Sequence, residues 1–153
     1  MGKLNVKPAQ KWYEMADNDL RSAEILKRHL DLIENTCYHC QQAVEKYLKG
    51  YLILNRVNPP KSHDLGFLCD KCIEVNEKFR QIRNHCSDLT VYAIQTRYPW
   101  HIEITERDMH DALNNARHIR EFVQTVSREI IKDKTQPQVR KNYRDFLAMI
   151  PTR

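Results

Sequence analysis

The sequence predicts an all-α protein, folded as an antiparallel up-and-down bundle of four to five helices followed by a short C-terminal helix. Its 153 residues include only three glycines and six prolines, too few turn formers for a sandwich or barrel of many short strands. Apolar residues recur at steps of three and four along most of the chain, which is the spacing of one helix face. A chain of this length fits one domain.

Apolar stripes predict four helices in the first part of the chain. The first runs from about Pro8 to His29, and the second, which has the clearest periodicity, from about Thr36 to Asn55 with Thr36 as its N-cap. A third, short helix opens at Ser62 or Asp64, because either side chain can accept a bond from a free amide of the first turn. A fourth covers about residues 77–91.

The second part of the chain predicts a loop, a long helix and a tail. Residues 95–104 form an ordered loop, because the residue before Pro99 avoids the α region. Thr105 and Asp108 form a capping pattern for a helix that ends near Lys132. Beyond it, an amphipathic and basic tail carries apolar residues at helical spacing: Val139, Tyr143, Phe146, Leu147 and Ile150. It packs on the bundle or on a second copy, or alternatively docks a partner or nucleic acid.

Five cysteines include two C-x-x-C pairs, CYHC at 37–40 and CDKC at 69–72, and Cys86 is left over. Both pairs coincide with apolar stripes of predicted helices, and neither has a neighbouring glycine to open a zinc knuckle. A thioredoxin-like motif would follow a strand, and no such strand is predicted. The pattern favours thiols packed in the core. A zinc site between helices and a redox centre at Cys37 are the alternatives, and no metal or cofactor is expected.

The charge and the termini bear on partners and location. The formal net charge of +5 permits a polyanion partner, and it also fits a soluble surface of mixed charge. The start of the chain carries no charged-then-apolar signal segment, and no apolar run reaches about 18 residues. We therefore expect a cytoplasmic protein without a membrane partner.

Three stretches taken together resemble the HEPN domain: YHCQQAVEKYLKGYL at 38–52, SHDL at 62–65 and TRYP at 96–99. The resemblance covers residues 9–131, as a HEPN-like helical bundle, and leaves residues 132–153 as a basic C-terminal extension with a short amphipathic helix. It implies a bundle of four or five helices, often dimeric and frequently encoded beside a minimal nucleotidyltransferase. The expected partners are thus a second copy of the chain, a nucleotidyltransferase-like protein, and a nucleotide or RNA.

Two groups of side chains are candidates for binding a nucleotide or phosphate. Lys46 and Lys49 lie on a polar stripe of the second helix, and with His63 they could line a phosphate-binding cleft; a solvated helix face is the alternative. In the loop region, Arg97 could pair with phosphate, while Tyr92 and Tyr98 could stack on a base. The alternative for this loop is packing, either within the bundle or at a dimer interface.

Many HEPN proteins are metal-independent RNases, and the resemblance implies a motif of Arg, four to six residues, and His, often followed by x-Tyr. Arg80 and His85 have this spacing, but Ser87 stands where the tyrosine belongs. Starting instead at Arg83 puts Tyr92 at the tyrosine position and Thr90 at the histidine position. Since threonine does not titrate near neutral pH, this register predicts a site that binds without cleaving.

The sequence therefore predicts a nucleotide- or RNA-associated binding module of the HEPN type rather than an enzyme. Two alternatives remain open. One is a metal-independent RNase toxin of a toxin–antitoxin pair, using Arg80 or Arg83 with His85. In it the histidine moves the 2′-hydroxyl proton and the arginine holds the phosphate. The other is a purely structural adaptor that dimerises and binds nothing.

Overall fold

The computed structural model describes residues 3–95, 103–134 and 144–151, and every regular element in these ranges is helical. This confirms the all-α fold class. A further short helix spans residues 144–149. The elements before it are, in order, α1 (Val6–Leu26), the 3₁₀ turn η1 (Leu30–Leu32), α2 (Ile33–Leu54), α3 (Leu65–Val75), the 3₁₀ helix η2 (Glu77–Ile82), α4 (Arg83–Leu89), α5 (Tyr92–Gln95) and α6 (Glu106–Asp133).

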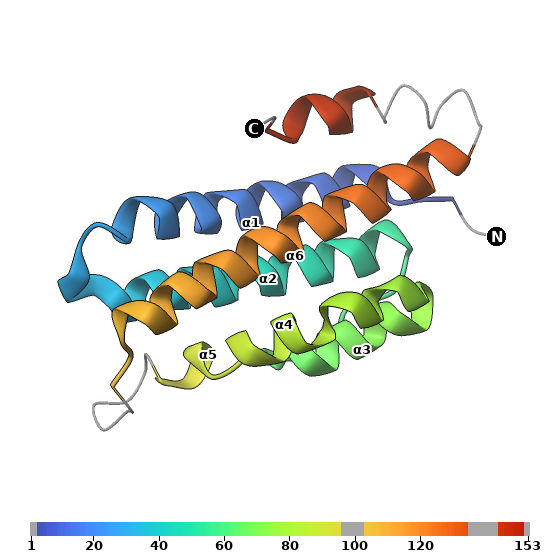
Figure 1. The fold of residues 1–153 in the computed structure, drawn as a ribbon. Helices are drawn as coiled ribbons and strands as arrows, with labels where there is room; N and C mark the ends of the chain where they lie inside the picture. Colours follow the sequence, from blue (N-terminus) through green and yellow to red (C-terminus); the bar gives the residue numbers. More distant parts are fainter. Residues whose placement is uncertain (1–2, 96–102, 135–143, 152–153) are drawn as a thin grey trace.

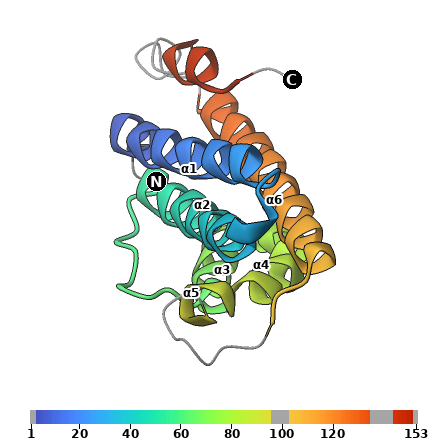
Figure 2. The same ribbon diagram turned by 90° about the vertical axis from the view of Figure 1, so that its left-hand side faces the viewer.

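Helix α2 is the centre of the bundle, because it packs against α1, α3, α5 and α6. Figure 1 shows the long helices α1, α2 and α6 side by side, and the view along them in Figure 2 places α3, α4 and α5 on the other side of α2 from α1. The central position explains why both apolar and polar residues of α2 are buried, including Gln41 and Glu45. Helices α1 and α2 approach closely at Gly50, where a β-carbon would lie 2.7 Å from a ring carbon of Tyr13.

The starts of α3 and α6 follow the predicted capping chemistry, and the start of α2 does not. Asp64 is the N-cap of α3, and its carboxylate accepts a hydrogen bond from the amide of Phe67 at 3.1 Å. Thr105 and Asp108 form the predicted capping box of α6. Thr36 is not an N-cap: α2 begins one turn earlier, at Ile33, and the Thr36 hydroxyl donates to the carbonyl of Leu32. The chain turns through η1 directly into α2, so no polar cap is needed there.

The helix predicted over residues 77–91 is divided into η2 and α4, and a turn at residues 90–91 leads into α5. The side-chain oxygen of Asn76 accepts a hydrogen bond from the amide of Lys78. The backbone carbonyl of Asn76 accepts one from the amide of Phe79, and this contact starts a 3₁₀ turn. In a 3₁₀ helix residues three apart lie over each other, so Phe79 and Ile82 both face the core. Periodicity of three and four does not distinguish this arrangement from one continuous α-helix.

The C-terminal segment, residues 144–151, packs on the bundle across α1 and α6, on the side away from α3 and α4 (Figures 1 and 2). Phe146 and Ile150 are only 1% and 7% exposed. The ring of Phe146 meets that of Tyr13 edge-on at 5.7 Å, and the Tyr13 hydroxyl is hydrogen-bonded to Ser127 of α6. The tail is thus packed against its own bundle at these positions. Val139 and Tyr143, which the sequence assigned to the same stripe, lie outside the described residues.

An ion pair joining α1 to α6 makes the fold sensitive to acid. The guanidinium of Arg117 donates two hydrogen bonds to the carboxylate of Glu24 and lowers the pKa of that carboxyl from 4.5 to about 2. Because the folded-state pKa is the lower one, the pair stabilises the fold fully above about pH 4.5 and the contribution is lost as the pH falls toward 2. The carboxylate is one-third exposed, so solvent screening reduces the effect.

We expect Glu24→Gln to be less stable than the wild type near neutral pH and to lose less stability in acid. Urea unfolding at about pH 6 and about pH 3 measures both quantities. Asp145→Asn is the control, because Asp145 is exposed in the C-terminal segment. Equal losses of stability in the wild type and in Glu24→Gln would contradict the assignment of this acid sensitivity to the pair.

Candidate functional site

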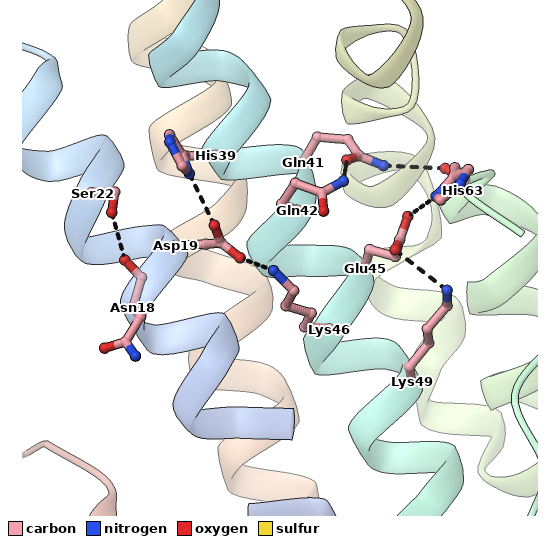
Figure 3. Close-up of polar contacts among 10 residues, drawn as sticks. All are labelled: Asn18, Asp19, Ser22, His39, Gln41, Gln42, Glu45, Lys46, Lys49 and His63. Carbon is pink, nitrogen blue, oxygen red and sulfur yellow. Dashed lines mark hydrogen bonds and ion pairs between the residues drawn. The ribbon is translucent and has the colours of Figure 1, made fainter. Parts of the chain in front are cut away.

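Two acid–base clusters lie on the outward side of α2, and we call them together the α2 face (Figure 3). The first cluster consists of Asp19, His39 and Lys46, and the second of Glu45, Lys49 and His63. Helix α1 supplies Asp19, the segment before α3 supplies His63, and α2 supplies the other four. Three of the predicted binding residues, Lys46, Lys49 and His63, are therefore on this face.

In the first cluster the carboxylate of Asp19 bridges two bases. One of its oxygens lies 2.9 Å from Nδ1 of His39, and the other accepts a hydrogen bond from the ammonium of Lys46. All three side chains are less than one-third exposed. The pairing joins α1 to α2 and fixes where the ammonium and the imidazole lie at the surface.

In the second cluster the carboxylate of Glu45 has the same role, and it is more deeply buried. Glu45 is 6% exposed; one oxygen lies 2.7 Å from Nδ1 of His63 and the other accepts from Nζ of Lys49 at 3.3 Å. The amide of Gln41 donates to the backbone carbonyl of His63 at 3.2 Å, and Gln42 donates to the side-chain oxygen of Gln41 at 2.7 Å. These contacts hold the segment before α3 against α2.

The arrangement balances both carboxylates and leaves the side chains of Lys49 and Lys46 11% and 19% exposed. Each histidine uses Nδ1 for a carboxylate, so Nε2 is the nitrogen left for a ligand, and the His63 side chain is 59% exposed. Two lysines offset two carboxylates, and the two imidazoles add further hydrogen-bonding nitrogens to the face. A phosphate at either cluster can receive hydrogen bonds from one lysine and one imidazole.

The predicted catalytic residues do not meet within one chain. Arg83 donates two hydrogen bonds, of 2.9 and 3.1 Å, to the carboxylate of Asp70 on α3. It also donates one to the hydroxyl of Ser87 at 2.7 Å. His85 faces α6 instead: its Nδ1 lies 2.9 Å from the side-chain oxygen of Asn115, and its ring packs 4.6 Å from that of His118. Residues two apart on a helix point to different sides. Arg80 is exposed on η2 and pairs with Glu77.

The remaining predicted site residues lie near the end of α4 and beyond it. Thr90 is at the histidine position when the RNase motif is started at Arg83. Its hydroxyl accepts a hydrogen bond from the amide of Leu65 and so stabilises the start of α3. Tyr92 lies in α5, half-buried against the core, and burial raises the pKa of its hydroxyl. Arg97 and Tyr98 lie outside the described residues.

The four thiols of the C-x-x-C pairs are buried in α2 and α3, which confirms the prediction that they pack in the core. Burial raises the pKa of Cys37 to about 12 and that of Cys40 further, so these thiols are not activated nucleophiles. Within the described ranges, no group of three or more histidine, cysteine or acidic side chains is arranged to hold a metal ion.

A cavity of about 900 Å³ lies between α1, α6 and the C-terminal segment, away from the α2 face. Four of the charged groups that line it are already paired: Arg117 with Glu24 at 2.7 Å, and Arg120 with Asp17 at 2.9 Å. Four carboxylates line the cavity against three arginines, so its charge balance does not favour a phosphate. We therefore place the candidate phosphate site on the α2 face.

Sequence reasoning missed Asp19, His39 and Gln41. His39 lies within CYHC, a pattern that suggests a role for the cysteines rather than for the histidine. Asp19 is one of several acidic residues on α1. Only the i,i+4 spacing of Glu45 and Lys49 gave a local signal for a contact. The partners of the other residues are 18 to 27 positions away in the sequence.

The comparisons with known proteins agree with this architecture. The family model for the HEPN domain matches residues 9–129. This chain belongs to the HEPN family. The HEPN match ends before the C-terminal segment that packs across α1 and α6. Within the described residues, no helix is long and apolar enough to cross a membrane. A comparison with curated proteins found no match.

Two solved structures resemble this HEPN chain. TT1696 from Thermus thermophilus has 29% sequence identity and a TM-score of 0.64, and the match covers 76% of this chain and 96% of that one. ST0689, an archaeal HEPN homologue, has 24% identity and a TM-score of 0.63, with coverage of 83% and 99%. The second likeness shows the shared fold alone. Both relatives are matched almost completely, whereas part of this HEPN chain has no counterpart in them.

Proposed function

We propose that this HEPN chain is a nucleotide- or RNA-associated binding module whose α2 face holds phosphate groups. The observation that carries the proposal is the position of Lys46, Lys49 and His63 on the α2 face, where Lys49 and His63 share the carboxylate of Glu45 and Lys46 binds Asp19. Asp19 and Glu45 keep the basic side chains extended and in place before a ligand arrives, which reduces the entropy lost on binding. The role of the chain is then to present a phosphate-bearing molecule rather than to react with it.

We expect Lys46→Gln and Lys49→Gln each to weaken the binding of a short single-stranded RNA about tenfold at low salt, because each loses one ammonium contact to phosphate. Fluorescence anisotropy with a labelled RNA, repeated over a salt series and with ATP as competitor, measures the loss. For a single strand, the slope of log affinity against log salt should fall by about 0.7 per lost contact. Lys11→Gln is the matched control, since Lys11 is exposed on α1 outside the α2 face.

Two results would contradict the proposal. If neither RNA nor ATP binds at low salt, the adaptor function is favoured. If Lys11→Gln weakens binding as much as the two α2-face variants do, the interaction reflects the general positive charge and not a site.

We further propose that the module works as a homodimer with a nucleotidyltransferase-like protein in the cytoplasm. Family membership supports this proposal. We also propose that residues 132–153 form a C-terminal extension to the HEPN bundle. Light scattering of the purified chain tests the dimer. Co-expression with a minimal nucleotidyltransferase encoded next to it, followed by co-purification, tests the partner.

The RNase alternative predicts metal-independent cleavage that requires His85. Because Arg83 and His85 contact different helices, we expect no cleavage of single-stranded RNA in the presence of chelator, and no difference between the wild type and His85→Ala. Gel analysis at high protein concentration measures this. Cleavage that disappears in His85→Ala would establish the RNase in place of the binding module.

A further inference from the structure

Helices α3 and α4 pack closely enough to bring two thiols together. A β-carbon built on Gly66 would lie only 3.1 Å from the Ser87 hydroxyl, and one turn along α3 Asp70 binds Arg83. These two contacts pair α3 and α4 in opposite directions. Cys69 and Cys86 lie between them in this register, on the inner side of the two helices, and both are completely buried.

The thiols of CDKC point to different neighbours. Cys72 donates to the carbonyl of Leu48 on α2 at 3.5 Å. Cys69 donates to the carbonyl of Phe79 at 3.5 Å and forms a side-chain hydrogen bond with Cys86. The partner of Cys69 is therefore the cysteine that the sequence left unpaired, and not its C-x-x-C neighbour.

The two thiols of this contact differ in character. The hydrogen bond from Cys86 lowers the pKa of Cys69, and the nearby guanidinium of Arg83 acts in the same direction against the effects of burial and of Asp70. The same hydrogen bond, together with burial, raises the pKa of Cys86. Cys69 is thus the thiol that more readily becomes a thiolate, which is the nucleophilic form.

We propose that Cys69 and Cys86 form a redox-sensitive pair that a hydroperoxide converts into a disulfide linking α3 to α4. The Cys69 thiolate attacks one peroxide oxygen, the O–O bond breaks, and a sulfenic acid forms. The other oxygen leaves and is protonated, to water from hydrogen peroxide or to an alcohol from an organic hydroperoxide. Cys86 then attacks the Cys69 sulfur; the S–S bond forms, the S–O bond breaks, and hydroxide leaves with the Cys86 proton as water. The two sulfurs are oxidised and the peroxide is reduced.

The disulfide would act on the part of the fold that carries Arg83 and His85. It closes a loop through η2 and restricts the separation of α3 from α4. Because both thiols are buried, the reaction requires a local opening of the short helices η2 and α4, which are joined to α3 by the exposed Asp70–Arg83 pair. This redox site is separate from the α2 face and does not depend on phosphate binding there.

Peptide mapping of the full-length protein tests the proposal. Trypsin places the relevant cysteines in different peptides: residues 62–71 hold Cys69, residues 72–78 hold Cys72 and residues 84–97 hold Cys86. After hydrogen peroxide treatment and alkylation of the remaining thiols, we expect peptides 62–71 and 84–97 to be joined, with the loss of two hydrogens. A dithiol reductant should restore both free thiols. Cys72→Ala should leave this disulfide intact, and Cys69→Ala should abolish it.

The outcomes are distinct. A disulfide between peptides 62–71 and 72–78 would overturn the proposal in favour of a C-x-x-C centre. Free Cys86 after treatment, or a joined pair that forms only in denaturant, would also overturn it. The wild-type map is decisive by itself if a variant fails to fold, which circular dichroism would show.

Discussion

We expect Glu45→Ala to lower the free energy of unfolding by about 3 kcal/mol, because it leaves the nearly buried ammonium of Lys49 without its carboxylate. The same substitution removes the anchor of His63 and so should also loosen the segment before α3. Stability and the geometry of the α2 face therefore depend on one side chain.

Urea unfolding followed by circular dichroism measures this loss. The double variant Glu45→Ala with Lys49→Met should recover part of it, since removing both charges avoids an unpaired one. Glu74→Ala is the matched control: it breaks the exposed pair with Lys71 and should change stability by less than about 1 kcal/mol. If Glu45→Ala behaves like this control, the carboxylate is not a buried counter-ion, and the account of the second cluster fails.

Arg120→Met should also lower the free energy of unfolding by about 3 kcal/mol. Nε of Arg120 donates to Asp17 at 2.9 Å, and Asp17 accepts a further bond from the hydroxyl of the buried Tyr47. When the Gln124 amide is turned so that its oxygen faces the guanidinium, it accepts from Arg120 at 2.8 Å. Methionine keeps most of the side-chain volume but leaves the carboxylate without its cation.

The same unfolding measurement tests this network. Arg80→Met is the control, because the Arg80 side chain is 67% exposed and its pair with Glu77 lies in solvent. Combining Asp17→Asn with Arg120→Met should cost less than the sum of the two single substitutions, as expected for groups in one network. Additive losses would show that the α1–α6 contact does not depend on this charge pair.

Much of the fold could be predicted from local pattern. Helices α1, α2, α3 and α6 appear close to their predicted positions, because apolar spacing and side-chain caps act within a few residues. The division of residues 77–91 was missed, since a 3₁₀ turn that puts Phe79 and Ile82 into the core has the same apolar spacing as an α-helix.

The candidate site was predicted only in part. Lys46, Lys49 and His63 were selected from the sequence, but Asp19 and His39 were not, because nothing local says which acid on α1 faces α2. The residue spacing of the RNase motif also could not show that Arg83 faces α3 while His85 faces α6. The direction in which a side chain of such a short helix points depends on how the neighbouring helices pack against it.

The sequence by itself determined the helical class, the family and the burial of the cysteines, because these follow from periodicity and from motifs along the chain. The tertiary structure decided which charges neutralise each other and that Cys69 meets Cys86 rather than Cys72. The physical reason is that contacts between distant segments depend on how helices cross and how closely they approach. Gly66 permits such an approach between α3 and α4, and the chain's local pattern does not contain that information.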